Sequence, residues 1–233
     1  PIRFRSMNEY QQYAKFQWIR LNLQKRPLGK DQRLESYSPD GNIVLGEKIG
    51  SGHNGWAARM RIINQIKMHD NLEELINRAK VKPFPSLAAL RPKKILDFII
   101  EPSARDWTEE QKNYFRQGDF FEEEGEPPEK IPYTYFYRFT TEDNKERKLM
   151  IEDWEIGSLY RNCRNGAHGD ETAANQKVRQ KYESFAKKPN LFFFIGTTLA
   201  NHWRSPNPFI IIGVVPSLAD INMRQGELFP IMP

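Results

Sequence analysis

The sequence predicts an α+β fold, with helices interleaved between the strands of a mixed or largely antiparallel sheet; a partly closed barrel is the alternative form of that sheet. A first indication is the alternating aromatic and polar run IPYTYFYRFT, which a charged turn connects to a second strand-like run, KLMIED. Two short apolar runs near the C-terminus, LFFFIGTT and PFIIIGVVP, add buried strands. Segments with helical spacing lie between these strands, and this order favours strands that pair locally.

Composition favours a single folded domain over residues 1–233. The 233 residues contain 39% hydrophobic and 12% aromatic side chains, which can bury a large core. Lys and Arg outnumber Asp and Glu by 35 to 30, and the formal net charge of +5 leans towards a polyanionic partner. Because the chain opens on Pro1 rather than Met, we expect residues to be missing from its native N-terminus.

The cysteine content and the hydropathy pattern bear on the cellular location. Cys163 is the one cysteine of the chain, so no internal disulfide can form, which suits a reducing compartment. The apolar runs are too short to cross a bilayer, and the charged N-terminal segment is unlike a signal peptide. We therefore expect a soluble cytoplasmic protein without a membrane partner.

The N-terminal part of the chain is expected to contain strands and helices in alternation. Apolar residues alternate in FQWIRLNLQ and IVLGEKI, and the polar segment between them carries Pro and Gly residues that break regular structure. Asp70 or Asn71 can cap the last helix of this part. In chain order the expected elements are helix 7–15, strand 16–24, strand 43–49, helix 56–68 and helix 72–80.

The remaining elements follow from the hydrophobic period and from the signals for helix and strand ends. Pro102 ends a strand, Thr108 can cap a helix, and the acidic, proline-bearing segment 117–130 is expected to be an exposed loop or insertion. The expected order is strand 93–102, helix 107–115, strand 131–140, strand 148–153, helix 154–164, helix 172–188, strand 191–198 and strand 208–216.

Several classes of active site lack their sequence motifs here. The chain has no GxxxxGK[ST] phosphate loop, no HExxH pair and no GxSxG nucleophile turn. Gly50, Gly52 and Gly55 do fit GxGxxG after a short strand, but no acidic residue follows on a clear second parallel strand. A simple turn is therefore favoured over a dinucleotide-binding loop, although its amides could hold a nucleic-acid phosphate.

The segment IEDWEIG carries the strongest signal for metal chemistry. Asp153 and Glu155 follow a predicted strand, and many nucleases hold Mg²⁺ with carboxylates placed in this way. Asp170 or Glu171 could assist, but Gly157 stands where the common nuclease pattern has a lysine. The same carboxylates suit the first turn of the next helix, where they stabilise its N-terminus, and this structural interpretation is favoured.

Basic and aromatic residues are interleaved at two places, and this pattern is typical of nucleic-acid surfaces. The loop NHWRSPN is expected to expose its His, Trp and Arg side chains, and the helix NQKVRQKYESFAKK presents a row of cations. For both segments an ordinary solvated surface is the alternative, and for the helix that interpretation is favoured. The expected nucleic-acid contacts are Lys177, Arg179, Lys181, His202, Trp203 and Arg204.

Two segments, RQGDFF at 116–121 and RQGELF at 224–229, share a glutamine that is followed by a pair of large apolar residues. Peptides of this kind dock on the sliding clamps of DNA-processing machinery, where the apolar pair enters a pocket and the glutamine bonds at its rim. The match is loose, because Gly226 replaces the leucine usual in the bacterial peptide. The residues expected to bind such a clamp-like partner are Gln225, Leu228 and Phe229.

A set of segments resembles a family of prokaryotic proteins of uncharacterised function: EKIPYTYFYRF, MIEDWEIGSLYRN, KVRQKY, FFFIGT and PFIIIGVV. The resemblance extends to FQWIRLNL, RLESYSP and RPKKILDFIIEP, and so covers most of the chain. In that family a cysteine-bearing segment with a Gly-His pair often occupies the turn before IEDWEIG. Here the turn TTEDNKERK has neither Cys nor His, so the resemblance implies a fold but no metal ligand and no catalytic residue.

Together these features predict a protein that binds nucleic acid, with DNA as the expected ligand, as an accessory factor in DNA processing, repair or defence. A metal-dependent nuclease that uses Asp153 and Glu155 with Mg²⁺ is the first alternative. A protein-interaction subunit of a larger complex is the second. No cofactor is expected outside the nuclease alternative.

Overall fold

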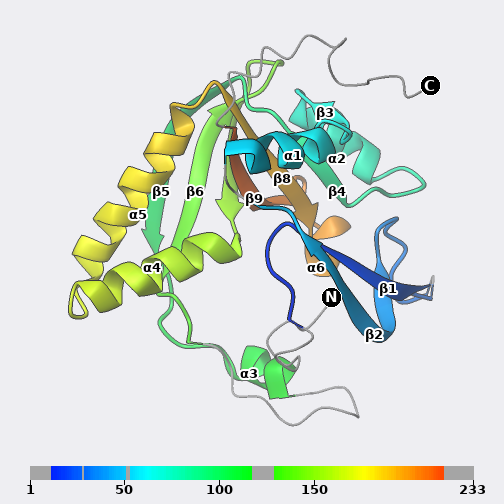
Figure 1. Ribbon diagram of the computed structural model, residues 1–233, viewed down its shortest axis with the longest axis horizontal. Coiled ribbons are helices and arrows are strands. Elements are labelled where there is room, and N and C mark those ends of the chain that lie inside the picture. The colour runs from blue at the N-terminus through cyan, green and yellow to red at the C-terminus, as the bar shows by residue number, and fades with distance from the viewer. Residues whose placement is uncertain (1–11, 28, 51–52, 117–128, 218–233) are drawn as a thin grey trace.

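The computed structural model describes residues 12–27, 29–50, 53–116 and 129–217 (Figure 1). Its helices and strands are, in chain order, β1 (Gln17–Lys25), β2 (Tyr37–Lys48), α1 (His53–Ile63), β3 (Met68–His69), α2 (Leu72–Ala79), β4 (Leu87–Leu90), β5 (Lys94–Pro102), α3 (Glu109–Arg116), β6 (Tyr133–Thr140), β7 (Glu146–Ile151), α4 (Trp154–Gly166), α5 (Glu171–Ala186), β8 (Asn190–Thr197), α6 (Leu199–His202) and β9 (Phe209–Ser217).

Two sheets organise these elements. The larger is a seven-stranded mixed sheet with the order β3-β4-β8-β9-β7-β6-β5, and the smaller is an antiparallel ribbon made of β1 and β2. In the larger sheet the pairs β3–β4 and β9–β7 are parallel and the other neighbours are antiparallel. The predicted α+β class is confirmed. The described sheet is not a closed barrel, because it ends in two edge strands, β3 and β5.

The main core lies between the larger sheet and the helices α2, α4 and α5. Consecutive residues of a strand point to opposite faces, and on β8 Phe193 enters this core while Phe192 enters a smaller one with residues of α1. Tyr137 of β6 stacks on Phe193 with the ring centroids 5.4 Å apart, although β9 and β7 lie between their strands. The sheet therefore curves between β8 and β6. Within this part, β7 and β9 pair at Ile151 and Ile211.

Helices α4 and α5 pack beside each other and against strands β5 and β6 (Figure 1). The buried residues of α5 are Ala174, Val178 and Tyr182, each four positions from the next, and this spacing forms one face of a helix. The carbonyl oxygen of Tyr182 accepts a hydrogen bond of 2.6 Å from the hydroxyl of Tyr137. This buried bond fixes the position of α5 along the sheet.

Most of the predicted elements are confirmed. The predicted hairpin is formed by β6 and β7, and the two long helices that follow it are α4 and α5. Strands β1, β5, β8 and β9 and helices α2 and α3 also occur where the sequence predicts them. Asn71, rather than Asp70, caps α2, because its side chain accepts hydrogen bonds from two amides of the first helical turn.

The N-terminal part differs from the prediction in its strand and helix ends. β2 begins inside the predicted loop, because its first residues pair with the end of β1 in the register Lys25–Tyr37. α1 ends at Ile63 rather than at residue 68, since Met68 and His69 form β3 and pair with β4. The sequence pattern does not predict β4 and α6, each of which has four residues, because so few residues show no period.

Some predictions fall wholly or partly outside the described residues. This applies to residues 7–11 of the predicted helix 7–15, whose described part, 12–15, is not helical. It also applies to residues 117–128 of the predicted loop 117–130. Of the helices in the described ranges, none has the length and apolar character needed to span a membrane.

Candidate functional site

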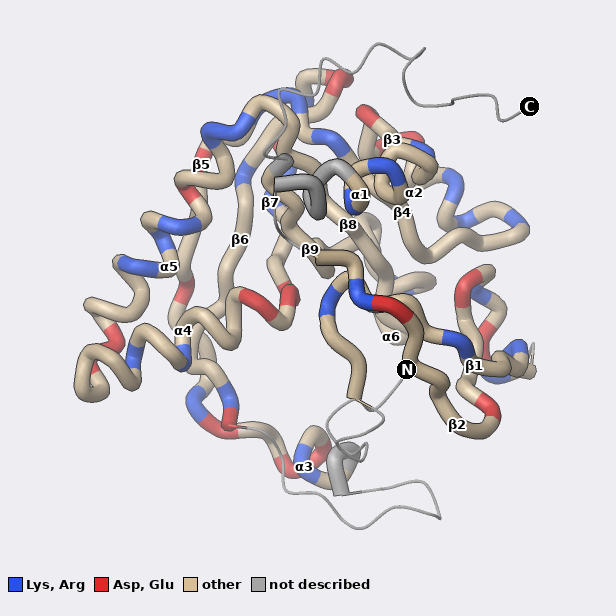
Figure 2. The backbone as a smooth tube through the Cα atoms, viewed as in Figure 1, with Lys and Arg blue, Asp and Glu red and all other residues tan. Residues whose placement is uncertain are grey.

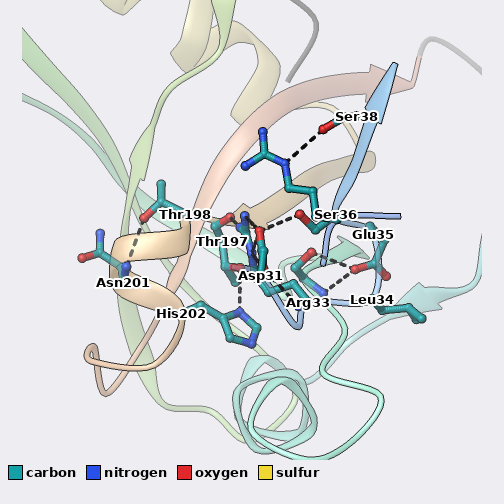
Figure 3. A network of polar contacts seen from close by, with 12 residues as sticks. Asp31, Arg33, Leu34, Glu35, Ser36, Ser38, Thr197, Thr198, Asn201 and His202 are labelled. Carbon is teal, nitrogen blue, oxygen red and sulfur yellow. Dashed lines mark hydrogen bonds and ion pairs between the residues drawn. The ribbon is translucent and has the colours of Figure 1, made fainter. Parts of the chain in front are cut away.

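A buried polar network joins the loop before β2 to the larger sheet (Figure 3). Its centre is the carboxylate of Asp31, a residue that is 2% exposed. The guanidinium of Arg33 donates to both carboxylate oxygens, with Nε 3.0 Å from Oδ1 and Nη2 2.7 Å from Oδ2. The hydroxyl of Ser36 donates to Oδ2 at 2.6 Å. Both oxygens of this buried carboxylate therefore have charged or polar partners, as a buried charge requires.

Further contacts extend the network to the start of β4 and the end of β8. Nη1 of Arg33 donates to the carbonyl oxygen of Thr197 at 2.5 Å. The carboxylate of Glu35 accepts hydrogen bonds from the amide and the hydroxyl of Ser86, both at 2.7 Å. The hydroxyl of Thr197 is hydrogen-bonded to Nδ1 of His202 at 2.8 Å. The network thus fixes the loop between β1 and β2 on the larger sheet.

The protonation states of the network follow from its burial and its hydrogen bonds. Burial alone would raise the pKa of Asp31, but the hydrogen bonds from Arg33 and Ser36 outweigh it and hold that pKa well below its ordinary value. Burial lowers the pKa of His202, so its imidazole is neutral at pH 7. Asp31 and Arg33 are therefore both charged at physiological pH and form an ion pair. This suits a structural role rather than proton transfer.

An exposed group of aromatic and basic side chains lies beside this network. We call it the Trp203 patch, and its members are Lys80, Lys82, Phe84, Trp203 and Arg204. Trp203 is 45% exposed, and its ring meets that of Phe84 edge to face with the centroids 4.9 Å apart. The ring of the buried His202 lies 4.5 Å from it. The tryptophan is therefore held in place by rings while much of its surface stays open to solvent.

The Trp203 patch carries cations next to its rings. The side chains of Lys80, Lys82 and Arg204 are exposed, and none of the three forms an ion pair with a residue in the described ranges. Nζ of Lys80 donates to the carbonyl oxygen of Pro206 at 3.4 Å, so the loop after α2 lies against the loop after α6. An open aromatic ring among cations that no carboxylate neutralises can accept a flat ring and an anionic group side by side.

The predicted cations of α5 lie on a different part of the molecule. Lys177 and Lys181 are exposed one helical turn apart. Arg179 is half-buried, where it donates to the carbonyl oxygen of Phe98 at 2.7 Å and pairs with Glu183 at 3.2 Å. Figures 1 and 2 show α5 and α6 well apart, with β6 and β9 between them, so the structure does not bring these cations together with the Trp203 patch.

The expectation that His202 is exposed is wrong. Its side chain is fully buried, and the short helix α6, capped by Thr198, places it against Thr197. The next residues, Trp203 and Arg204, are exposed as expected. A buried imidazole cannot contact a ligand at the surface. Its role is structural, because its ring packs against that of Trp203.

The acidic motif forms a helix cap and a surface ion pair. Asp153 is the N-cap of α4, and its Oδ1 accepts a hydrogen bond of 2.9 Å from the amide of Glu155. Its Oδ2 accepts one of 3.1 Å from the amide of Val214 on β9. Burial raises the pKa of Asp153 against these hydrogen bonds. The side chain of Glu155 pairs with Lys15. This geometry agrees with the structural interpretation of the motif.

The carboxylates expected to assist a metal ion have other partners. Asp170 caps α5 through two amides of its first turn. Glu171 pairs with Arg105 and accepts a hydrogen bond of 2.9 Å from the hydroxyl of Tyr133. Within the described part of the chain, no group of three or more His, Cys, Asp or Glu residues is arranged to hold a metal ion.

Replacing Asp153 with alanine is expected to lower the free energy of unfolding by about 1–3 kcal/mol. The variant loses the N-cap of α4 and leaves the buried amide of Val214 without its acceptor. Urea denaturation followed by circular dichroism measures the loss. Glu155→Ala is the matched control, because it removes an exposed ion pair worth about 0–1 kcal/mol. Equal losses in the two variants would contradict the capping role.

Two further predicted sites are the C-terminal RQGELF segment and the glycine-rich segment after β2. Gln225, Leu228 and Phe229 lie outside the described residues, so the clamp-like partner stays a prediction. The dinucleotide-binding alternative for the glycine-rich segment is wrong, because the preceding strand, β2, pairs antiparallel with β1 in the separate ribbon. A dinucleotide-binding loop follows a strand of a parallel sheet, and β2 does not belong to such a sheet.

Sequence reasoning missed three of the five residues of the Trp203 patch, and it missed the buried ion pair of Asp31 and Arg33. The segment AKVKPF combines cations with an aromatic residue, as the loop NHWRS does, and this similarity is the one available signal. Asp31 and Arg33 occur in a polar stretch between two prolines, where a solvated loop is the ordinary expectation. Their burial depends on Thr197, which is remote in the sequence.

Family models match both parts of the chain. A model described as Domain of unknown function (DUF8757) matches residues 68–230, and one described as Domain of unknown function (DUF8758) matches residues 1–65. No curated protein and no solved structure matches the chain. The two matched segments meet between α1 and β3, so the bond from Arg33 to Thr197 joins one segment to the other.

Proposed function

The chain belongs to the DUF8757 family, and from this starting point we propose that it binds nucleic acid, with DNA as the expected ligand, through the Trp203 patch. The family description carries no activity, so the proposal rests on the chemistry of the patch. In this proposal the protein is a prokaryotic, cytoplasmic accessory factor in DNA processing, repair or defence.

The observation that carries the proposal is the open ring of Trp203 among three exposed cations. Stacking of a base on an aromatic side chain contributes about 1–3 kcal/mol and is available to every base. Arg204 follows Trp203 in the chain and Lys82 precedes Phe84 by two residues; both are exposed, and neither forms an ion pair with a described carboxylate. Such cations attract phosphates and release their counterions. The patch thus combines the two contacts that a nucleotide offers, a flat base and an anionic backbone.

The buried network supports the proposal by holding the patch in place. Arg33 bonds to Thr197, the last residue of β8, and Thr197 bonds to His202, whose ring lies against Trp203. A binding surface that is already ordered loses less conformational entropy when its ligand arrives. The overall charge of +5 acts in the same direction, because it raises the encounter rate with a polyanion.

Trp203→Ala is expected to weaken binding to a single-stranded oligonucleotide roughly 10–100-fold, since one stacking contact is lost. Fluorescence anisotropy of labelled DNA and RNA across a salt series measures the affinity and its salt dependence.

In the same salt series, Lys82→Ala is expected to reduce the salt slope for a single strand by about 0.7 if Lys82 contacts one phosphate. Strand lengths after incubation with Mg²⁺ test the nuclease alternative in the same samples.

The matched control is Trp154→Ala, which removes another exposed tryptophan from α4, on a different part of the molecule. Its affinity is expected to equal that of the unaltered protein. The double variant Lys177→Ala with Lys181→Ala tests the α5 cations separately. Absence of binding by the unaltered protein at low salt would overturn the proposal and favour a protein-interaction subunit.

A further inference from the structure

We propose that the nucleic acid is a single strand that passes from the Trp203 patch onto the β1–β2 ribbon, where the ring of Tyr37 stacks a second base. The inference rests on the proposed function and adds to it the strand type and a second contact site. Tyr37 is the first residue of β2 and is 41% exposed. It belongs to the segment 1–65, whereas Trp203 belongs to the segment 68–230, so the binding surface is shared between the two family-matched segments.

A short series of direct contacts connects the two rings. Nζ of Lys25 lies 4.8 Å from the centre of the Tyr37 ring and donates a hydrogen bond to the carbonyl oxygen of Leu34 at 2.7 Å. The amide of Leu34 donates to the carbonyl oxygen of Phe84 at 3.0 Å. The ring of Phe84 lies 4.9 Å from that of Trp203. A ligand of several nucleotides can therefore reach both rings.

The path between the rings is held by the buried network. Leu34 lies between Arg33 and Glu35, which bond to the end of β8 and to Ser86 (Figure 3). Nζ of Lys25 also donates to the carbonyl oxygen of Arg33 at 2.5 Å. Because these bonds fix the loop between β1 and β2 on the larger sheet, the separation of the two rings is set before a ligand binds.

The charges along the path favour a phosphate backbone. Lys25 bonds to carbonyl oxygens rather than to a carboxylate, so its positive charge remains beside Tyr37. At the other end the exposed Arg204 follows Trp203 in the chain, and the exposed Lys82 lies two residues before Phe84, whose ring contacts Trp203. Each stacking position thus has a cation beside it, which is the arrangement that single-strand-binding grooves use.

A single strand fits this surface better than a duplex. Bases in a duplex are stacked on their neighbours and paired, so a protein ring cannot lie on their faces without opening the helix. Trp203 and Tyr37 both offer ring faces on which an unpaired base can stack. Bases that are not paired can turn towards these rings while the backbone follows the cations.

The test compares Tyr37→Ala with Trp203→Ala on oligothymidylates of about 4, 8, 12 and 16 nucleotides, a range that matches known single-strand site sizes. Trp203→Ala is expected to weaken binding at every length. Tyr37→Ala is expected to leave the shortest strand unaffected and to weaken binding of the longer strands by roughly 5–50-fold. Tyr37→Phe keeps the ring and is expected to keep the affinity, and Trp18→Ala, at the far end of β1, is the matched control.

The outcomes separate this inference from the proposed function. If Trp203→Ala weakens binding and Tyr37→Ala does not at any length, the second stacking site is wrong while the proposed function stands. Duplex DNA that binds as tightly as the single strand would overturn the strand type. Loss of affinity in Trp18→Ala equal to that in Tyr37→Ala would also overturn the assignment, because it would indicate a general weakening of the ribbon. Failure of the unaltered protein to bind any strand would overturn both this inference and the proposed function.

Discussion

Asp31→Ala is expected to lower the free energy of unfolding by about 3–5 kcal/mol, because the variant leaves a largely buried guanidinium without its counter-charge. The side chain of Asp31 is fully buried and that of Arg33 is 16% exposed. In the variant, Arg33 keeps its hydrogen bond to the carbonyl of Thr197 but loses both bonds to the carboxylate. The hydroxyl of Ser36 loses its acceptor as well.

Urea denaturation at neutral pH measures this loss, and Glu101→Ala provides the comparison. Glu101 pairs with Lys148 at 2.5 Å, but both side chains are more than two fifths exposed. Removal of such a pair costs about 0–1 kcal/mol. The double variant Asp31→Ala with Arg33→Met removes both charges and is expected to recover part of the stability. A loss in Asp31→Ala as small as that in Glu101→Ala would contradict the importance of the network.

The loss of stability in Asp31→Ala is also expected to depend on pH. The folded-state pKa of Asp31 lies below its ordinary value of about 4, so the carboxylate stabilises the folded protein at all pH values above that ordinary value. This contribution is lost as the pH falls through the folded-state pKa. The difference in stability between the unaltered protein and Asp31→Ala is therefore expected to stay constant from pH 7 to about pH 5 and to shrink below about pH 4. A difference that grows at acidic pH would reverse the assigned direction of the pKa shift.

Phe193→Ala is expected to cost about 3–5 kcal/mol of stability, since it leaves a cavity in the main core that the neighbouring strands cannot close. Phe193 is fully buried on β8. Its ring stacks on that of Tyr137 and meets that of Phe139 edge to face, in both cases with the centroids 5.4 Å apart. These contacts connect β8 with β6 across the two strands between them, so their loss removes packing between the two halves of the sheet.

Phe136→Ala is the control for this prediction, because Phe136 lies next to Tyr137 on β6 and points to the other face of the sheet. Its ring is half-buried under the ammonium group of Lys148, 4.1 Å from the ring centre. We expect a loss of roughly 1–2 kcal/mol for this variant. Thermal and urea unfolding of both variants provide the measurement, and a larger loss for Phe136→Ala would show that the core is not centred where the structure places it.

The sequence predicts the elements whose pattern is complete within a few residues. The hairpin of β6 and β7 and the helices α4 and α5 are long, periodic and bounded by turn or cap signals, so local physics is enough to identify them. β4 and α6 are too short to show a period. The two-residue strand β3 was also missed, because its first residue, Met68, fits the helical spacing of the predicted helix 56–68. β2 begins early because pairing with β1 extends it into a segment whose own composition favours a loop.

The candidate site is predicted less completely, and the reason is visible in its residues. Trp203 and Arg204 are found from the sequence because an aromatic residue and a cation in a loop between two buried strands are exposed by default. His202 has the same local setting and is buried, since the turn of α6 directs it to Thr197. The cations of α5 have an equally good local pattern, yet α5 lies apart from α6, the helix that Trp203 follows (Figure 2).

The sequence by itself determined the α+β class, most of the element order and the exposure of Trp203 and Arg204 in the last loop. It did so because hydrophobic period, capping and turn chemistry act between residues a few positions apart. Only the tertiary structure decided that Asp31 and Arg33 form a buried ion pair, and that Phe84 lies beside Trp203. These neighbours are distant in the chain, and their meeting depends on how the sheet bends and how the loop between β1 and β2 packs on it, which no local pattern encodes.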